Sequence, residues 1–287
     1  AVGARGVSSD AGEVYLFYND GTLPTTAASA DLTITGTALS DFFGVSMTAG
    51  DFNADGRTDI AVGARGYSTN TGRAYIFYND GSIPTTAATA DVIITGNATN
   101  DEFGIGITAG DVNADGRTDL IVGAEGYSTS TGRAYIFYND GSIPTTAGTA
   151  DVTITGETTN TYFGSSMTTG DLNSDGTIDL VVGASTTGIS AGKVFIFYND
   201  GSIPTTAGTA DVTITGDSGK PGFGNKVETG DFNADGKTDL VAGADMNSFG
   251  ILYIFYNDGS IPTTAATADV TITGVLSSSK FGYTFAM

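Results

Sequence analysis

Short apolar stretches alternate with turn-forming residues along the chain, and their order repeats about every 60 residues. One stretch, GRAYIFYNDG at residues 72–81, carries apolar side chains on both faces of an extended chain, which predicts a strand buried between neighbouring sheets. Another, DVTITG at residues 151–156, places Val and Ile on one face and the two Thr on the other, which is typical of a half-exposed outer strand.

Two further stretches complete the repeating unit. FGVSMTAGD at residues 43–51 is rich in small residues and predicts an inner strand crowded near an axis, and DIAVGA at residues 59–64 predicts the strand that follows it. Four short strands in a unit too small to fold alone are typical of a β-propeller blade. A solenoid is the alternative, but it requires distinct polar end caps, and we find none in the sequence.

Counting these stretches gives five copies of each strand, so we predict an all-β fold, a β-propeller of five four-stranded blades. Residues 1–287 would form a single domain. The chain begins within the second stretch and ends within the first, so the first blade would be shared between residues 1–36 and 281–287. Pairing of these N- and C-terminal segments would close the ring and remove open sheet edges.

An acidic loop connects the first and second strands of each unit. It reads DFNADGRTD at residues 51–59 and recurs at residues 111–119, 171–179 and 231–239. Side-chain oxygens at positions 1, 3, 5 and 9, a backbone carbonyl at position 7 and a Gly that permits a sharp turn at position 6 suit calcium. We therefore expect about four calcium ions, with the candidate ligands Asp51, Asn53, Asp55, Arg57, Asp59, Asp111, Asn113, Asp115, Arg117, Asp119, Asp171, Asn173, Asp175, Thr177, Asp179, Asp231, Asn233, Asp235, Lys237 and Asp239.

The acidic loop has two other interpretations. A solvated acidic turn needs no metal, but four copies in register favour a metal site. An EF-hand loop requires an acidic residue at position 12 that leads into a helix. Position 12 here is Val62, Val122, Val182 or Ala242, each inside an apolar stretch, so the loop joins strand to strand.

Composition narrows the chemistry of the chain. The absence of Cys and His excludes disulfides, zinc sites of the usual ligand types, thiol catalysis and His-based acid/base chemistry. A net charge of −21 opposes binding to nucleic acid or anionic lipid, and no apolar run approaches the length of a membrane-spanning helix. We expect no nucleic-acid partner and no membrane insertion. Outside the acidic loops no pair of carboxylates recurs, so we also expect that the protein is not an enzyme.

Phe-Gly in the first stretch and Gly-Ala in the second, on either side of DxNxDGxxD, resemble the FG-GAP repeats that form the β-propeller of integrin α subunits and of bacterial and fungal relatives. The resemblance covers essentially the whole chain. It implies calcium in the loop between the first two strands and ligand binding on the opposite face. Integrin-type propellers have seven blades, whereas this chain has five repeats, and no Pro follows Gly-Ala here.

The loops that follow Gly-Ala and ITG differ most among the repeats, whereas NDGSIPTTA is identical in four copies. Variable loops on a rigid scaffold are where binding usually occurs. The candidate ligand-binding residues are a polar ring at the mouth of the channel, Arg5, Arg65, Glu125, Ser185 and Asp245, and two tyrosines that could stack on a sugar, Tyr67 and Tyr127. The alternatives are a solvated rim with Arg65 paired to Glu125, and tyrosines that only pack the loops.

These observations favour a calcium-binding extracellular β-propeller, secreted or at the cell surface, that acts in adhesion. Its partner would be a protein or glycan ligand at a cell surface or in the matrix. One alternative is a structural subunit of a surface layer, sheath or filament, with copies of the same chain as partners. The other is a lectin with one sugar site per blade, which predicts five similar pockets, although the loops that would form them are the least similar parts of the repeats.

Overall fold

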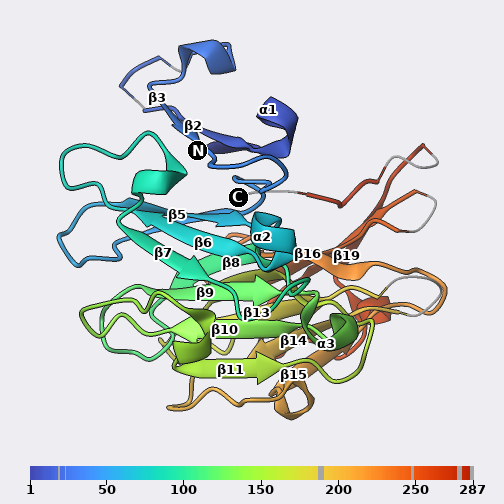
Figure 1. Ribbon diagram of the computed structural model, residues 1–287. Helices are drawn as coiled ribbons and strands as arrows, with labels where there is room; N and C mark the ends of the chain where they lie inside the picture. The colour runs from blue at the N-terminus through green and yellow to red at the C-terminus, as the bar shows by residue number, and fades with distance from the viewer. Residues whose placement is uncertain (19, 23, 187–190, 247–248, 277–279, 285–287) are drawn as a thin grey trace.

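The computed structural model describes residues 1–18, 20–22, 24–186, 191–246, 249–276 and 280–284, and five antiparallel sheets follow one another along the chain (Figure 1). The first sheet has three strands, β1 (Val2–Ala4), β2 (Glu13–Leu16) and β3 (Leu32–Thr35). The second and third are β4 (Met47–Gly50), β5 (Asp59–Ala64), β6 (Arg73–Phe77), β7 (Val92–Thr95), and β8 (Phe103–Gly110), β9 (Asp119–Ala124), β10 (Arg133–Phe137), β11 (Val152–Thr155). The fourth and fifth are β12 (Phe163–Gly170), β13 (Asp179–Ala184), β14 (Lys193–Phe197), β15 (Val212–Thr215), and β16 (Phe223–Gly230), β17 (Asp239–Ala244), β18 (Ile251–Phe255), β19 (Val270–Thr273).

Helical structure in the described residues is confined to short turns. Three are four-residue turns, α1 (Val7–Asp10), α2 (Tyr67–Asn70) and α3 (Tyr127–Ser130), which follow the second strands. Five are 3₁₀ turns that precede the outer strands, Ala27–Ser29, Ala87–Thr89, Ala147–Thr149, Ala207–Thr209 and Ala265–Thr267. No helix in the described part of the chain is long and apolar enough to cross a membrane.

Each complete sheet is a meander of four strands, and its inner strand bends. In the third sheet, Gly110 pairs with Asp119 next to the acidic loop, and the register shifts between Phe103 and Ile107. The same shift occurs in the fourth and fifth sheets. This irregularity lets the Phe-Gly end of the inner strand reach the preceding sheet, where Phe103 forms a parallel bridge with Gly72.

The Phe of each Phe-Gly pair fills the space between two sheets. Phe103 is fully buried, and its ring meets the edges of Tyr135 and Phe137 at centroid distances of 5.5 and 6.3 Å. Its backbone carbonyl lies where a Cβ on Gly72 would stand, 2.0 Å away. Phe43, Phe163 and Phe223 make the corresponding pairs of ring contacts.

Close backbone contact explains the Gly of Gly-Ala. A Cβ added to Gly63 would stand 2.0 Å from the carbonyl oxygen of Gly104 in the next sheet, a distance that no side chain can occupy. The contact recurs between Gly123 and Gly164, at 1.9 Å, and between Gly183 and Gly224, at 2.0 Å. The Phe-Gly and Gly-Ala pairs are therefore the two halves of one contact between successive sheets.

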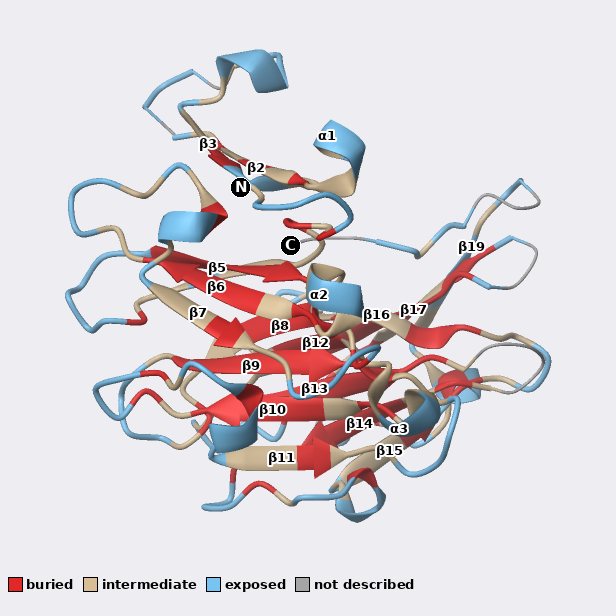
Figure 2. Ribbon diagram, in the orientation of Figure 1, coloured by how far each residue is buried: buried red, intermediate tan, exposed pale blue. Residues whose placement is uncertain are grey.

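Burial follows the predicted roles of the strands. In the second, third and fourth sheets, the second and third strands are buried along nearly their whole length, and the outer strands bury a single Ile, such as Ile94 or Ile154 (Figure 2). The predictions of a buried third strand, a half-exposed fourth strand and an all-β propeller of five blades are confirmed. The first blade differs in having three strands in the described residues.

Closure of the ring would depend on contacts between the N- and C-terminal segments. Phe281 bridges Gly250 of the last sheet, as the other Phe-Gly pairs do, and Gly3 and Tyr283 line the same cavity. Residues 285–287, which would complete the missing inner strand, lie outside the described residues. Phe281 is 37% exposed and Ile272 is 42% exposed, whereas their counterparts in the other sheets are buried. Closure of the ring and a single domain over residues 1–287 stay predictions.

Candidate functional site

The four acidic loops share one hydrogen-bond arrangement. In the first loop, the backbone N–H of Asp55 donates to side-chain oxygens of Asp51, at 3.1 Å, and of Asn53, at 3.0 Å. Gly56 N–H donates to the other oxygen of Asp51 at 2.8 Å, and Arg57 N–H donates to Asp55 at 2.9 Å. The other three loops repeat these bonds. The oxygens at positions 1, 3 and 5 therefore converge on one turn of backbone.

The Asp at position 9 is set apart from these three. Asp119 is fully buried and accepts hydrogen bonds from the backbone N–H groups of Val112, at 3.0 Å, and Asn139, at 2.8 Å. Burial raises the pKa of its carboxyl to about 6, although these two bonds oppose the rise. Asp119 thus ties the acidic loop to the turn after β10, a structural role that the motif alone does not indicate.

Residues at position 7 also connect the loop to that turn. The guanidinium of Arg57 donates to the carbonyl of Asn79 at 3.2 Å, and Arg117 does the same to Asn139. In the third loop the hydroxyl of Thr177 donates to the carbonyl of Asn199 at 3.0 Å. Arg and Thr side chains thus make the same connection, which accounts for the variation at this position among the first three loops.

The donor set of these loops fits a hard divalent cation. Each loop offers carboxylate and amide oxygens from three side chains held around one turn, and Ala54 and Gly56 adopt the positive φ values, 59° and 83°, that make the turn tight. Among the described residues, no three carboxylates converge closely enough to form a metal site by themselves. A cation would have to draw Asp59 and its equivalents toward the other oxygens.

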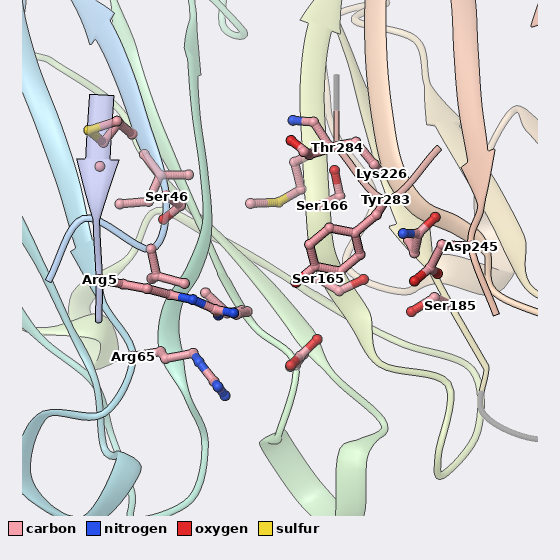
Figure 3. Close-up of a pocket in the computed structure, with 18 of the residues that line it drawn as sticks. Arg5, Ser46, Arg65, Ser165, Ser166, Ser185, Lys226, Asp245, Tyr283 and Thr284 are labelled. Atoms are coloured by element: carbon pink, nitrogen blue, oxygen red, sulfur yellow. The ribbon is translucent and has the colours of Figure 1, made fainter. Parts of the chain in front are cut away.

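A cavity of about 600 Å³ lies among the inner strands, at the opposite ends of the second strands from the acidic loops. All five residues of the predicted polar ring line this cavity, because each one directly follows the second strand of its sheet (Figure 3). In Figure 3, Arg5 and Arg65 lie on one side of the cavity and Ser185 and Asp245 on the other. The ring residues are Arg5, Arg65, Glu125, Ser185 and Asp245.

The electrostatics of the cavity differ from the expected rim in one respect. Arg65 forms its ion pair with Glu102, and the pairing with Glu125 that the sequence suggested is not present. Burial, with a further contribution from the charge of Glu102, raises the pKa of Glu125 to about 7, and nearby Arg65 opposes the rise. Glu125 can therefore act as a hydrogen-bond donor or acceptor near neutral pH.

The two candidate tyrosines are placed elsewhere. Tyr67 begins α2 and Tyr127 begins α3, and neither lines the cavity. The guanidinium of Arg73 lies 3.5 Å from the centre of the Tyr67 ring, and that of Arg133 lies 3.6 Å from Tyr127. Each ring thus makes a cation–π contact with the first residue of the following strand.

Comparisons with known proteins agree with the repeat pattern. Residues 43–77 and 103–137 match the FG-GAP repeat, and residues 171–242 match the FG-GAP-like repeat. The chain is 31% identical to integrin alpha-PS5 of Drosophila melanogaster over 226 residues, which are 71% of this chain and 21% of that protein. It is 31% identical to human integrin alpha-X over 160 residues, 53% of this chain and 14% of that protein.

The chain is also similar to an enzyme. It is 33% identical to phosphatidylinositol-glycan-specific phospholipase D of Bos taurus over 177 residues, 55% of this chain and 21% of that protein. The expectation that the protein is not an enzyme is therefore wrong as an inference from these repeats. That expectation rested on the absence of His, Cys and paired carboxylates from this chain. The chain spans about a fifth of the length of these relatives, so its composition describes only the module that they share.

Phe-Gly and Gly-Ala form the contacts between successive sheets, the acidic loops lie between the strands that carry them, and the family match falls on these same residues. The chain is therefore a β-propeller that belongs to the FG-GAP repeat family.

Proposed function

We propose that this propeller is a calcium-stabilised extracellular module of the adhesion type, which binds a protein or glycan ligand at the end that carries the cavity. Its place would be outside the cell, in secreted form or at a cell surface. One observation carries the proposal: the residues that differ among repeats gather around one cavity, whereas the near-identical acidic loops lie at the other end. A constant end and a variable end are what a stabilised binding scaffold requires.

Calcium is the part of the proposal that the acidic loops support. In each loop the side chains at positions 1, 3, 5 and 9 would supply oxygens, and the residue at position 7 would supply its backbone carbonyl. Twelve of the 32 acidic residues lie in these four loops, so a bound cation would offset the repulsion within each cluster. Binding to the folded state alone would raise its stability by mass action.

The ligand end is supported by the cavity and by the relatives. The cavity has the size of typical ligand pockets and is lined by charged and hydroxyl side chains from all five sheets or the turns after them. Integrin α subunits are among the similar proteins, and they are the source of the adhesion assignment.

Calcium titration of the metal-free protein by calorimetry tests the first part. We expect about four sites in the wild type and one fewer in Asp55→Ala. Chelation with EDTA should lower the melting temperature of the wild type. An unchanged transition in EDTA, or an unchanged stoichiometry in Asp55→Ala, would contradict the calcium assignment.

A second candidate function is a structural subunit that associates with copies of itself. Apolar side chains near the last sheet are uncovered, with Val275 89% exposed and Leu276 69% exposed. Such surface is typical of a contact site. Sedimentation at increasing protein concentration distinguishes the two: a concentration-dependent polymer supports the structural subunit, and a monomer at every concentration supports the binding module.

A further inference from the structure

Polar atoms without partners gather at the cavity. Among the described residues, seven buried side-chain nitrogen or oxygen atoms lack a hydrogen bond, and four of them belong to residues that line this cavity. They are Nε of Arg65, Oγ of Ser165, Oδ1 of Asn225 and Oδ1 of Asp245. A buried polar atom without a partner destabilises the folded state, so a concentration of such atoms in one cavity indicates groups that a bound molecule satisfies.

The unpartnered atoms differ in kind between the two sides. Asn225 lies on β16, the inner strand of the last sheet, and Asp245 directly follows β17, the second strand. Both present unpartnered acceptor oxygens to the cavity. Only 6% of the surface of Asp245 is exposed, and it forms no ion pair in the described part of the chain. A ligand must therefore bring hydrogen-bond donors to this side.

The opposite side presents donors with positive charge. Arg65 has a buried Nε without an acceptor, while its Nη1 pairs with Glu102. Arg5 is exposed, and no ion pair of its guanidinium occurs among the described residues. Lys226 also lines the cavity, but its charge is paired with Glu228 at 2.7 Å. A ligand must bring an anionic acceptor to Arg5 and Arg65.

A single ammonium group would not meet the needs of the acceptor side. The unpartnered oxygens come from two sheets, Ser165 from the fourth and Asn225 and Asp245 from the fifth, so several donors at separate places are required. Vicinal hydroxyl groups supply such donors, and they can also accept from the Ser165 hydroxyl. The charged arginines match a planar carboxylate, which a guanidinium binds with two parallel hydrogen bonds.

We propose that the cavity binds one small acidic sugar, with its carboxylate at Arg5 and Arg65 and its hydroxyl groups at Asp245, Asn225 and Ser165. This deepens the proposed function, because it names a ligand class for the same end of the propeller. It differs from the lectin alternative, since it gives the whole propeller one site in place of one site per blade. Glu125, whose pKa lies near 7, adds a donor or acceptor beside Arg65.

The test uses isothermal titration calorimetry on the calcium-loaded protein, with D-glucuronate and D-galacturonate as probes. D-Glucose keeps the hydroxyl groups but lacks the carboxylate, and β-alanine is a zwitterion without hydroxyl groups. We expect one site for at least one uronate and at least tenfold weaker binding of glucose and β-alanine. No uronate binding, or binding of glucose or β-alanine as tight as that of the uronates, would overturn the proposal.

Variants locate the site. Asp245→Asn and Arg5→Met should each weaken uronate binding about tenfold, as expected for a lost hydrogen bond to a charged group. The matched controls are Asp258→Asn, in an exposed turn of the same sheet, and Lys220→Met, whose side chain does not line the cavity, and both should bind uronate as the wild type does. If Asp245→Asn fails to fold, Arg5→Met still decides the matter, because its side chain is exposed. Equal binding by Arg5→Met and the wild type would overturn the placement.

Calcium titration of the same variants separates the two proposals. Four calcium ions together with no uronate binding would refute the acidic sugar alone. Fewer sites in the wild type would refute the calcium assignment, whatever the outcome with uronate.

Discussion

Replacing Phe103 with Ala tests the contact that joins successive blades. Phe103 is fully buried and makes two edge-to-face ring contacts, each of which contributes about 0.5–1.5 kcal/mol beyond the area that it buries. Its neighbour across the sheet interface is the backbone of Gly72, which cannot move inward to fill the space. We expect the free energy of unfolding to fall by about 3–5 kcal/mol, the usual range for a buried Phe replaced by Ala.

Phe281 offers a matched control within the same chain. It occupies the corresponding position in the last repeat, but it is 37% exposed and has no ring contact among the described residues. Removing a side chain that is about two-thirds buried should cost about 1–2 kcal/mol. The two variants should therefore differ by about 2.5 kcal/mol, the difference between the midpoints of these two ranges.

Urea unfolding in saturating calcium, followed by circular dichroism and by tyrosine fluorescence, measures both losses. Coincident transitions by the two probes would justify the use of a single free energy for a repeat protein. Equal losses for Phe103→Ala and Phe281→Ala would refute the reasoning, since they would show that Phe281 is as well covered in solution as Phe103. That result would also favour closure of the ring.

Three further predictions follow from single contacts. In EDTA, where calcium makes no contribution, Asp119→Ala should lower the free energy of unfolding by about 2–4 kcal/mol, because two buried N–H groups lose their acceptor. Replacing the exposed Asp115 with Ala should lower it by less than about 1 kcal/mol. Equal losses for the two variants would contradict the structural role of Asp119. Gly123→Ala should cost about 3 kcal/mol or more by overlap with the carbonyl of Gly164, and Gly208→Ala, which meets nothing closer than 3.7 Å, should be neutral in the same urea assay. The pKa of Glu125 is raised from 4.5 to about 7 in the folded protein, so its stabilising contribution is complete below pH 4.5 and is lost as the pH rises to about 7. The melting temperature of the wild type should therefore fall relative to that of Glu125→Gln between pH 4.5 and about 7. Parallel curves of melting temperature against pH would contradict the raised pKa.

The strands were accessible to sequence reasoning because their signals are local. Alternation in DVTITG and the apolar faces of GRAYIFYNDG depend on residues two positions apart, and the repeat multiplies each signal. The polar ring was predicted for a related reason, since every member follows the second strand at the same place in the unit.

What the sequence did not show depends on partners that are distant along the chain. The side chain of Asn139 donates to the carbonyl of Phe52, 87 residues earlier, at 3.0 Å. Arg65 pairs with Glu102, from the connection between β7 and β8, instead of Glu125. Asp119 looks like a metal ligand in the motif, and only the fold reveals the two backbone groups that it satisfies. Repetition of a residue therefore did not distinguish a metal-binding role from a structural one.

Each Phe-Gly pair covers the sheet of the preceding repeat, and this order affects synthesis of the chain. While the ribosome extends the chain, the sheet that carries Gly72 keeps an open apolar face until Phe103, 31 residues later, has emerged. Every nascent intermediate before the last repeat thus ends in an unfinished surface. Because the repeats are nearly alike, a Phe-Gly pair from a neighbouring nascent chain fits that surface as well as the correct one, and crowded polysomes would favour such exchange between chains.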